Sequence, residues 1–157
     1  MTIADALDKN YARLERQLLQ VAEAMPADKY SFRPTAQART FGEQLRHISA
    51  VQWVVGAALL NEDPPVDVGD GDTGPHSLCT KSEIVKYVVG SFAYLRHAIK
   101  GCNGNNALEM IPHPYDPKNM RTERIALIVS YAGHGWEHYG QMVVYQRING
   151  IVPPPSA

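Results

Sequence analysis

The chain has 157 residues, of which 45% are hydrophobic and 20% charged, and its formal net charge at pH 7 is −1. These proportions are ordinary for a globular protein, and the length suits one domain, residues 1–157, with a sizeable core. The near-neutral charge, without a long run of Lys or Arg, argues against nucleic acid or an anionic membrane as the main partner.

The sequence gives no sign of export or membrane insertion. The first residues lack the apolar core of a signal peptide. There is no run of about 18 apolar residues, so we expect no transmembrane helix. The two cysteines, Cys79 and Cys102, form neither a CxxC pair nor a disulfide framework, so we expect reduced thiols and a cytoplasmic location.

Two segments in the first half of the chain have the pattern of an amphipathic helix. Residues 3–25 end at Pro26, and their apolar side chains recur every three or four residues, at Leu7, Tyr11, Leu14, Leu18, Val21 and Met25. The helix expected over residues 40–60 opens with a capping box, in which the Thr40 hydroxyl accepts a backbone hydrogen bond and Glu43 reaches back to the cap.

Two more helices are expected in the second half of the chain. Residues 80–100 open with another capping box, formed by Thr80 and Glu83, and their apolar stripe consists of Ile84, Val88, Phe92, Leu95 and Ile99. Residues 121–149 form the longest helical segment. It is followed by Gly150, a residue type favoured just after a helix, and then by a run of prolines.

Two connections, residues 61–79 and 102–120, are unusually long and contain many Gly, Pro and Asn residues. Loops longer than about 12–15 residues are uncommon in a compact domain and are often functional. A long connection also lets the chain cross over between parallel helices of a bundle. We find no convincing pair of strands, and the sequence therefore predicts an all-α four-helix bundle with a crossover connection.

Two histidines in the last helix, His134 and His138, are the most distinctive residues of the chain. Four residues apart on a helix, they lie one turn apart on the same face, a spacing at which two imidazoles can hold one metal ion. That face is the expected buried stripe of the helix, formed by Leu127, Tyr131, His134, His138, Gln141, Tyr145 and Ile148. Buried polar groups cost free energy unless something satisfies them, and a metal ion would do so.

A third ligand is expected from another helix, because a catalytic zinc-type site usually has three protein ligands and one open position. His47 is the best candidate, since it lies near the apolar face of the second helix. His97 is turned away from the stripe of the third helix, and His76 and His113 lie in the long connections. The sequence therefore predicts that His47 joins the pair in the last helix.

Three glycines, Gly133, Gly135 and Gly140, surround the histidine pair. Each lowers helix stability by roughly 0.5–1 kcal/mol relative to Ala. We infer that something approaches this backbone closely, either a bulky side chain of a neighbouring helix or a ligand.

Four further residues of the last helix are candidates for supporting the site. Glu137 is a hydrogen-bond acceptor for an imidazole, a general base acting on metal-bound water, or a solvated charge. Gln141 continues the stripe and is expected to orient the site. Tyr131 and Tyr145 flank it, and they either donate hydrogen bonds to a bound molecule or pack in the core.

Other metal-binding motifs do not fit this chain. A di-iron carboxylate bundle needs Glu-x-x-His pairs, and the Glu and His spacings here are different. A zinc-protease helix carries Glu directly after its first His, where this chain has Gly135. Residues 70–74 are similar to the start of a calcium loop, but Lys81 stands where that loop needs its final Glu.

The order of the three histidines resembles that in the DinB/YfiT-like family. The resemblance covers nearly the whole chain, and it rests on residues 30–34, on His47 within residues 41–48, on His134 and His138 followed by Gln141, and on residues 149–154.

The resemblance implies a fold, a metal centre and a class of reaction. It implies helices in up-down-down-up order, a homodimer, and one divalent ion, usually nickel or zinc, on His47, His134 and His138. Some members of the family are S-transferases or isomerases that use low-molecular-weight thiols. The family is also associated with stress responses, which is no evidence of nucleic-acid binding.

We therefore expect a metal-dependent enzyme that acts on small molecules, with thiol S-transfer as the favoured reaction. A bound ion would lower the pKa of a water or thiol and make it a nucleophile at neutral pH. The alternatives are a metal-dependent hydrolase, a non-catalytic metal-binding stress-response protein, and a dimerisation module without a metal. The sequence identifies neither the substrate nor the thiol.

Overall fold

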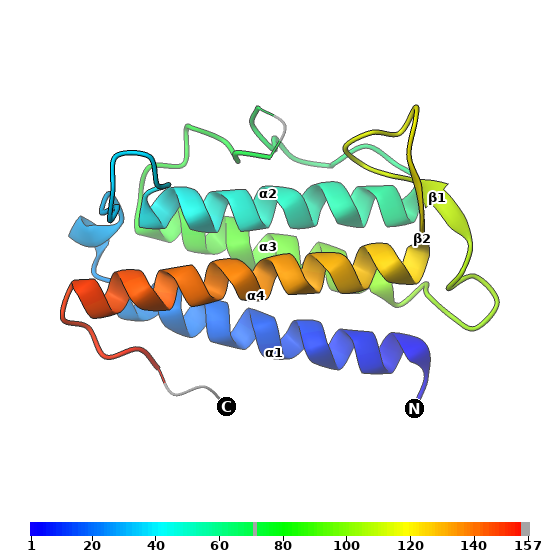
Figure 1. Ribbon diagram of the computed structural model, residues 1–157, viewed down its shortest axis with the longest axis horizontal. Coiled ribbons are helices and arrows are strands. Elements are labelled where there is room, and N and C mark those ends of the chain that lie inside the picture. Colours follow the sequence, from blue (N-terminus) through cyan, green and yellow to red (C-terminus); the bar gives the residue numbers. More distant parts are fainter. Residues whose placement is uncertain (71, 155–157) are drawn as a thin grey trace.

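Four long helices make up most of the protein. The computed structural model describes residues 1–70 and 72–154, with α1 (Ile3–Ala24), α2 (Phe41–Leu60), α3 (Lys81–Ile99) and α4 (Arg124–Ile148). The helices lie side by side, with α1 and α4 running in one direction and α2 and α3 in the other (Figure 1). α1 packs on α3 and α4, and α2 packs on the same two helices. This is the expected all-α bundle in up-down-down-up order.

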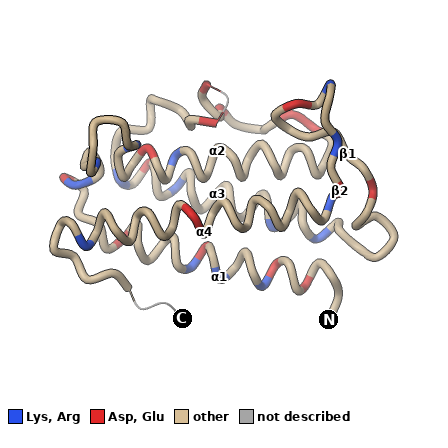
Figure 2. Tube along the Cα trace, in the orientation of Figure 1, with Lys and Arg blue, Asp and Glu red and all other residues tan. Residues whose placement is uncertain are grey.

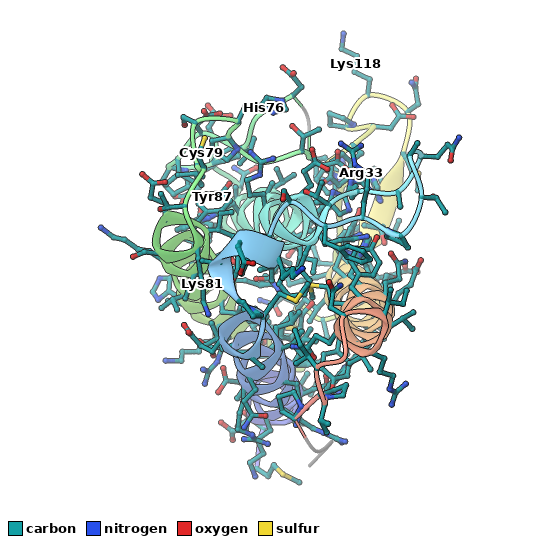
Figure 3. All side chains as sticks on the ribbon, turned by 90° about the vertical axis from the view of Figure 1, so that its left-hand side faces the viewer. Arg33, His76, Cys79, Lys81, Tyr87 and Lys118 are labelled. Carbon is teal, nitrogen blue, oxygen red and sulfur yellow. The ribbon has the colours of Figure 1, made fainter. Side chains whose placement is uncertain are left out.

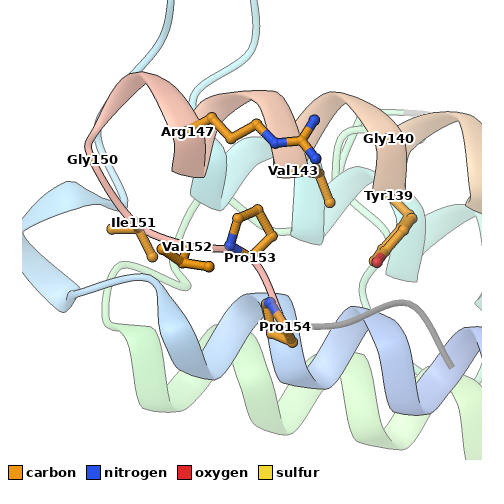
Figure 4. A pocket seen from close by; sticks show the side chains of 9 residues that line it. All are labelled: Tyr139, Gly140, Val143, Arg147, Gly150, Ile151, Val152, Pro153 and Pro154. Carbon is orange, nitrogen blue, oxygen red and sulfur yellow. The ribbon is translucent and has the colours of Figure 1, made fainter.

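The predicted capping boxes at Thr40 and Thr80 are confirmed. In each, the hydroxyl accepts a hydrogen bond from the backbone N–H three residues on, and the glutamate at that position accepts one from the threonine N–H. α1 starts with a third box at Thr2. After α4, Gly150 has a φ of 71°, and residues 150–154 turn back beside the helix, where they border a groove with Tyr139 and Arg147 (Figure 4).

A small hairpin precedes α4, although no strand pair was expected. β1 (Met110–Pro112) and β2 (Arg121–Glu123) pair antiparallel, with Ile111 opposite Thr122. The helix predicted from residue 121 therefore starts only at Arg124, after Glu123 as its N-cap. Strands of three residues are too short to show an alternating pattern, and they are held by pairing rather than by local preference.

The crossover between α2 and α3 passes directly over α2 (Figure 1). Gly74, with a φ of 73°, sits so close to α2 that a Cβ atom on it would lie 2.7 Å from Cβ of Arg46. The Arg46 guanidinium also donates a hydrogen bond to the carbonyl oxygen of Pro75, at 3.0 Å. These contacts fasten the loop over the turn of α2 that carries His47.

Acidic and basic residues are interspersed over the helices (Figure 2). One cluster of charged side chains links two helices. Arg96 of α3 donates hydrogen bonds to the carboxylates of Asp8 and Glu15 on α1, each at 2.7 Å. Within the described part of the chain, no helix is both long and apolar enough to cross a membrane.

The buried face of α4 differs in part from the expected stripe. Tyr131, His134 and Gln141 are only half-buried, and Ile148 is 56% exposed. The buried residues of this helix are Leu127, Ile128, Ala132, Gly135, His138, Met142, Tyr145 and Gln146. A helix with about 3.6 residues per turn drifts against a strict repeat of 3.5 residues, so its buried face is displaced from the predicted stripe. As a result His138 lies in the core and His134 at its border.

The three glycines of α4 have different surroundings. A Cβ atom on Gly135 would lie only 2.5 Å from Cδ2 of Leu14, a fully buried residue of α1. Close helix packing therefore explains Gly135. Around Gly133 and Gly140, apart from the chain neighbours and the nearby backbone of α4 itself, no atom of the described residues lies within 4 Å of such a Cβ atom, so packing explains neither of them.

Candidate metal centre

His47 of α2 and His134 and His138 of α4 come together where these two helices face each other. Nε2 of His134 lies 3.1 Å from Nε2 of His47 and 3.0 Å from Nε2 of His138. One nitrogen from each ring lies within 4.8 Å of the other two. His47 and His138 are buried and His134 is half-buried, so the group lies at the edge of the core.

The second nitrogen of each buried imidazole faces an oxygen that can only accept a hydrogen bond. Nδ1 of His47 is 2.8 Å from the carbonyl oxygen of Asp72, and Nδ1 of His138 is 2.6 Å from Oε1 of Gln44. Both Nδ1 atoms must therefore carry the hydrogen, which leaves a lone pair on each Nε2. These two lone pairs point toward Nε2 of His134.

This arrangement fits a divalent metal ion. Two nitrogens bound to one zinc-type ion at about 2.0–2.1 Å each would be about 2.8–3.4 Å apart. The two Nε2 separations, 3.1 and 3.0 Å, fall in that range. Without an ion, the single hydrogen that His134 can carry on Nε2 could satisfy only one of the two facing lone pairs. The three histidines therefore form a group that could hold a metal ion.

The surroundings keep all three imidazoles in the neutral form that binds metals. Burial, and then electrostatic interactions with His134 and His47, lower the pKa of His138 to about 3. Burial is also the main cause of the lowered pKa values of His47 and His134. The positive charge of Arg39 acts in the same sense on all three.

Gln44, which contacts Nδ1 of His138, belongs to a wider hydrogen-bond network. The Nε2 group of Gln44 donates to Oε1 of Gln141 at 2.9 Å and to the Tyr145 hydroxyl at 3.3 Å. The hydroxyl of Tyr145 in turn donates to the backbone carbonyl of Arg39 at 2.9 Å. Within the described residues, Gln141 and Tyr145 are therefore linked to His138 through Gln44.

Two carboxylates act on the histidine group. Oδ2 of Asp72 is 3.4 Å from Nδ1 of His47, on the crossover loop. Glu137 is exposed on α4, and its charge opposes the lowering of the pKa of His134. The Glu137 carboxylate accepts a long hydrogen bond, of 3.5 Å, from Gln141. Among the described residues, no hydrogen bond joins Glu137 to an imidazole.

Aromatic rings border the exposed edge of the group. The ring of Tyr131 lies 6.0 Å from that of His134, and Tyr115 and His113 of the loop before β2 lie 6.2 and 6.5 Å from Tyr131. Burial, and then the charge of Asp72, raises the pKa of Tyr131. Both long connections thus contribute residues beside the histidines.

The other histidines and the cysteines lie outside the group. His97 is exposed on α3, as expected, and the His76 side chain is 71% exposed. His76 and Cys79 lie near each other on the segment that leads into α3 (Figure 3). Cys79 and the buried Cys102 are free thiols.

Sequence reasoning missed Gln44 and Asp72 as parts of the site. Gln44 lies one turn before His47 on the same helical face, which is a signal in the sequence. Asp72 has no such signal, because only the path of the crossover loop brings its backbone carbonyl to His47.

The comparisons with known proteins agree with the fold. The family model that describes the DinB superfamily matches residues 10–142. A conserved protein from Enterococcus faecalis has a similar solved structure, with a TM-score of 0.75 and 15% identity over 94% of this chain and 96% of its own.

DinB-like proteins from Bacillus cereus and Bacillus subtilis also have similar structures. Each has a TM-score of 0.74 and 14% identity, over 98% and 96% of this chain and 97% and 95% of their own chains. At this identity the likeness concerns the fold alone. No functionally curated protein matches the sequence. The family match covers most of the chain, and the chain belongs to the DinB superfamily.

Proposed function

We propose that this protein is a metal-dependent enzyme in which His47, His134 and His138 hold one divalent ion, nickel or zinc. The observation that carries the proposal is the convergence of three Nε2 atoms, two of them with lone pairs fixed by hydrogen bonds at Nδ1. Three protein ligands leave further positions of an ion open, which is typical of catalytic sites.

The charges around the histidines favour an anionic ligand. A divalent ion here would be accompanied by neutral imidazoles, by the positive charge of Arg39, and by the two carboxylates of Asp72 and Glu137. The sum is a net positive charge, which stabilises an anion such as a thiolate more than a neutral ligand. A bound ion would supply the Lewis acidity that lowers the pKa of a thiol or water.

We propose thiol S-transfer to an electrophilic small molecule as the reaction. The resemblance to thiol-dependent members of the family supports it, together with the preference of the site for an anion. Hydrolysis is the second candidate. We further infer that Glu137, whose charge acts on His134, accepts a proton from the water or thiol, and that Tyr131 contacts the substrate.

The test is a screen of low-molecular-weight thiols and electrophiles with protein purified without an affinity tag, whose metal content has been quantified. We expect turnover with one thiol that stops when the metal is removed and returns when it is restored. Metal-dependent hydrolysis without a thiol would favour the second candidate. Stoichiometric metal binding without turnover across the screen would instead favour a non-catalytic metal-binding protein.

The matched variants are His134→Ala and His97→Ala. His134→Ala removes one of the three converging nitrogens and should abolish stoichiometric metal binding, whereas the exposed His97 makes no contribution to the group. Unchanged metal affinity in His134→Ala would show that the site lies elsewhere.

We also propose that the protein is a homodimer that pairs through the outer face of α4. Val129, Val144 and Ile148 are 55%, 48% and 56% exposed on this helix. Exposed apolar side chains that gather on one part of a surface often mark a contact with another protein chain. Sedimentation equilibrium of the native protein tests this, and a monomer at micromolar concentration would contradict it.

A further inference from the structure

We propose that Gln44 is a positioning residue that fixes the tautomer and the orientation of His138. Its role in catalysis rests on the proposed function, but its effect on the imidazole does not. Gln44 is 3% exposed on α2, and its Oε1 atom lies 2.6 Å from Nδ1 of His138, the shortest contact made by any of the three imidazoles.

The orientation of the Gln44 amide is fixed by a chain of hydrogen bonds that ends at a group able only to accept. The backbone carbonyl of Arg39 can only accept a hydrogen bond, so the Tyr145 hydroxyl must donate to it. The oxygen of Tyr145 is then left to accept from the Nε2 group of Gln44. The second hydrogen of that amide is donated to Oε1 of Gln141. Both N–H bonds of the amide are used, so its oxygen faces His138.

The orientation of the Gln44 amide determines which nitrogen of His138 is free to bind a metal ion. An amide oxygen next to Nδ1 requires a hydrogen on Nδ1 of His138, and the lone pair is therefore on Nε2, the atom that points toward His47 and His134. The other tautomer would leave a lone pair against the lone pairs of the Gln44 oxygen in a buried place. It would also put a hydrogen where the metal is expected.

The lack of charge on Gln44 also affects which kind of ligand a bound metal ion would favour. Histidines that bind metals often donate to a carboxylate, which adds negative charge to the centre. Gln44 accepts the same hydrogen bond without a charge. It therefore orients His138 and leaves the positive charge of a bound ion available for an anionic ligand.

The test uses the full-length protein without metal, labelled with ¹⁵N, and long-range ¹H–¹⁵N spectra of the imidazole rings. In the wild-type protein we expect His138 as the Nδ1–H tautomer. Gln44→Leu removes the acceptor and should abolish the preference for this tautomer. Gln44→Glu keeps an acceptor at the same place and should retain it. The control is Gln52→Leu, which removes another buried glutamine of α2 that bonds to Ser91 and not to a histidine.

The affinity of the same four proteins for zinc is then measured by competition with a chelator. Outer hydrogen-bond partners of metal ligands are worth about 10–100-fold in metal affinity. We expect a loss of that size in Gln44→Leu, with the affinity retained in Gln44→Glu and Gln52→Leu. An Nδ1–H tautomer that persists in Gln44→Leu, or an equal loss in Gln52→Leu, would overturn the proposal. If no variant and no wild-type protein binds metal, the proposed function fails, and the tautomers of the metal-free proteins still decide the role of Gln44.

Discussion

At the scale of single residues, the histidine group combines burial with fixed hydrogen-bond roles. His47 and His138 could be predicted as ligands from their spacing and position, but the groups that fix their tautomers could not. Those groups are a backbone carbonyl at Asp72 and an amide at Gln44, which interact with the rings across elements distant in the sequence. Helical periodicity describes one element at a time and therefore carries no information about such contacts.

Acidification should destabilise the metal-free protein through His138. Its pKa is lowered from 6.5 to about 3 by burial and by the neighbouring histidines, so between these pH values the unfolded chain binds a proton that the folded protein does not. The contribution of His138 to the free energy of unfolding is fully present above about pH 6.5, and it is lost as the pH falls toward the pKa of His138 in the folded protein. Urea unfolding of the metal-free protein between pH 7.5 and pH 5 measures it.

The matched variants are His138→Gln and His97→Gln. Replacing His138 should flatten the dependence of the unfolding free energy on pH, whereas replacing the exposed His97 should leave it nearly as in the wild type. An equally steep dependence in His138→Gln would mean that other groups cause the acid sensitivity.

At the scale of helices and strands, the sequence predicts the helices and their caps well. It predicts less well which face of α4 is buried. Capping boxes and the glycine after α4 are local signals, and they lie where expected. The buried face of α4 drifts from the strict repeat read in the sequence, because the helix has about 3.6 residues per turn, and His134 therefore lies at the border of the core. The hairpin before α4 has no local signal, because its three-residue strands depend on pairing.

The glycines of α4 should respond in opposite ways to replacement by alanine. Gly140→Ala adds a methyl group that meets no described atom within 4 Å apart from its chain neighbours and the nearby backbone of α4, so the gain in helix propensity, roughly 0.5–1 kcal/mol, should appear in full. Gly135→Ala places the methyl group 2.5 Å from Cδ2 of the fully buried Leu14, and overpacking costs about 1–3 kcal/mol. Thermal unfolding should rank Gly140→Ala above the wild type and Gly135→Ala below it. The reverse order would contradict the packing described for α1 and α4.

At the scale of the whole molecule, the packing of α2 against α4 assembles the histidine group, and the crossover connection adds Asp72 to it. The up-down-down-up order requires a long link from α2 to α3, and this link is fastened over the turn of α2 that carries His47. The length of the loop was visible in the sequence, and its path was not. The same path brings Asp72 beside His47, where its backbone carbonyl and its carboxylate both lie near Nδ1 of the imidazole.

We propose that three imidazoles from two helices hold one ion through their Nε2 atoms. This can be tested by anomalous diffraction from crystals of tag-free protein loaded with nickel or zinc. We expect one anomalous peak per chain, at about 2.0–2.1 Å from Nε2 of His47, His134 and His138. A fully loaded protein whose peak lies elsewhere, or an ion bound through Nδ1 of His138, would contradict it.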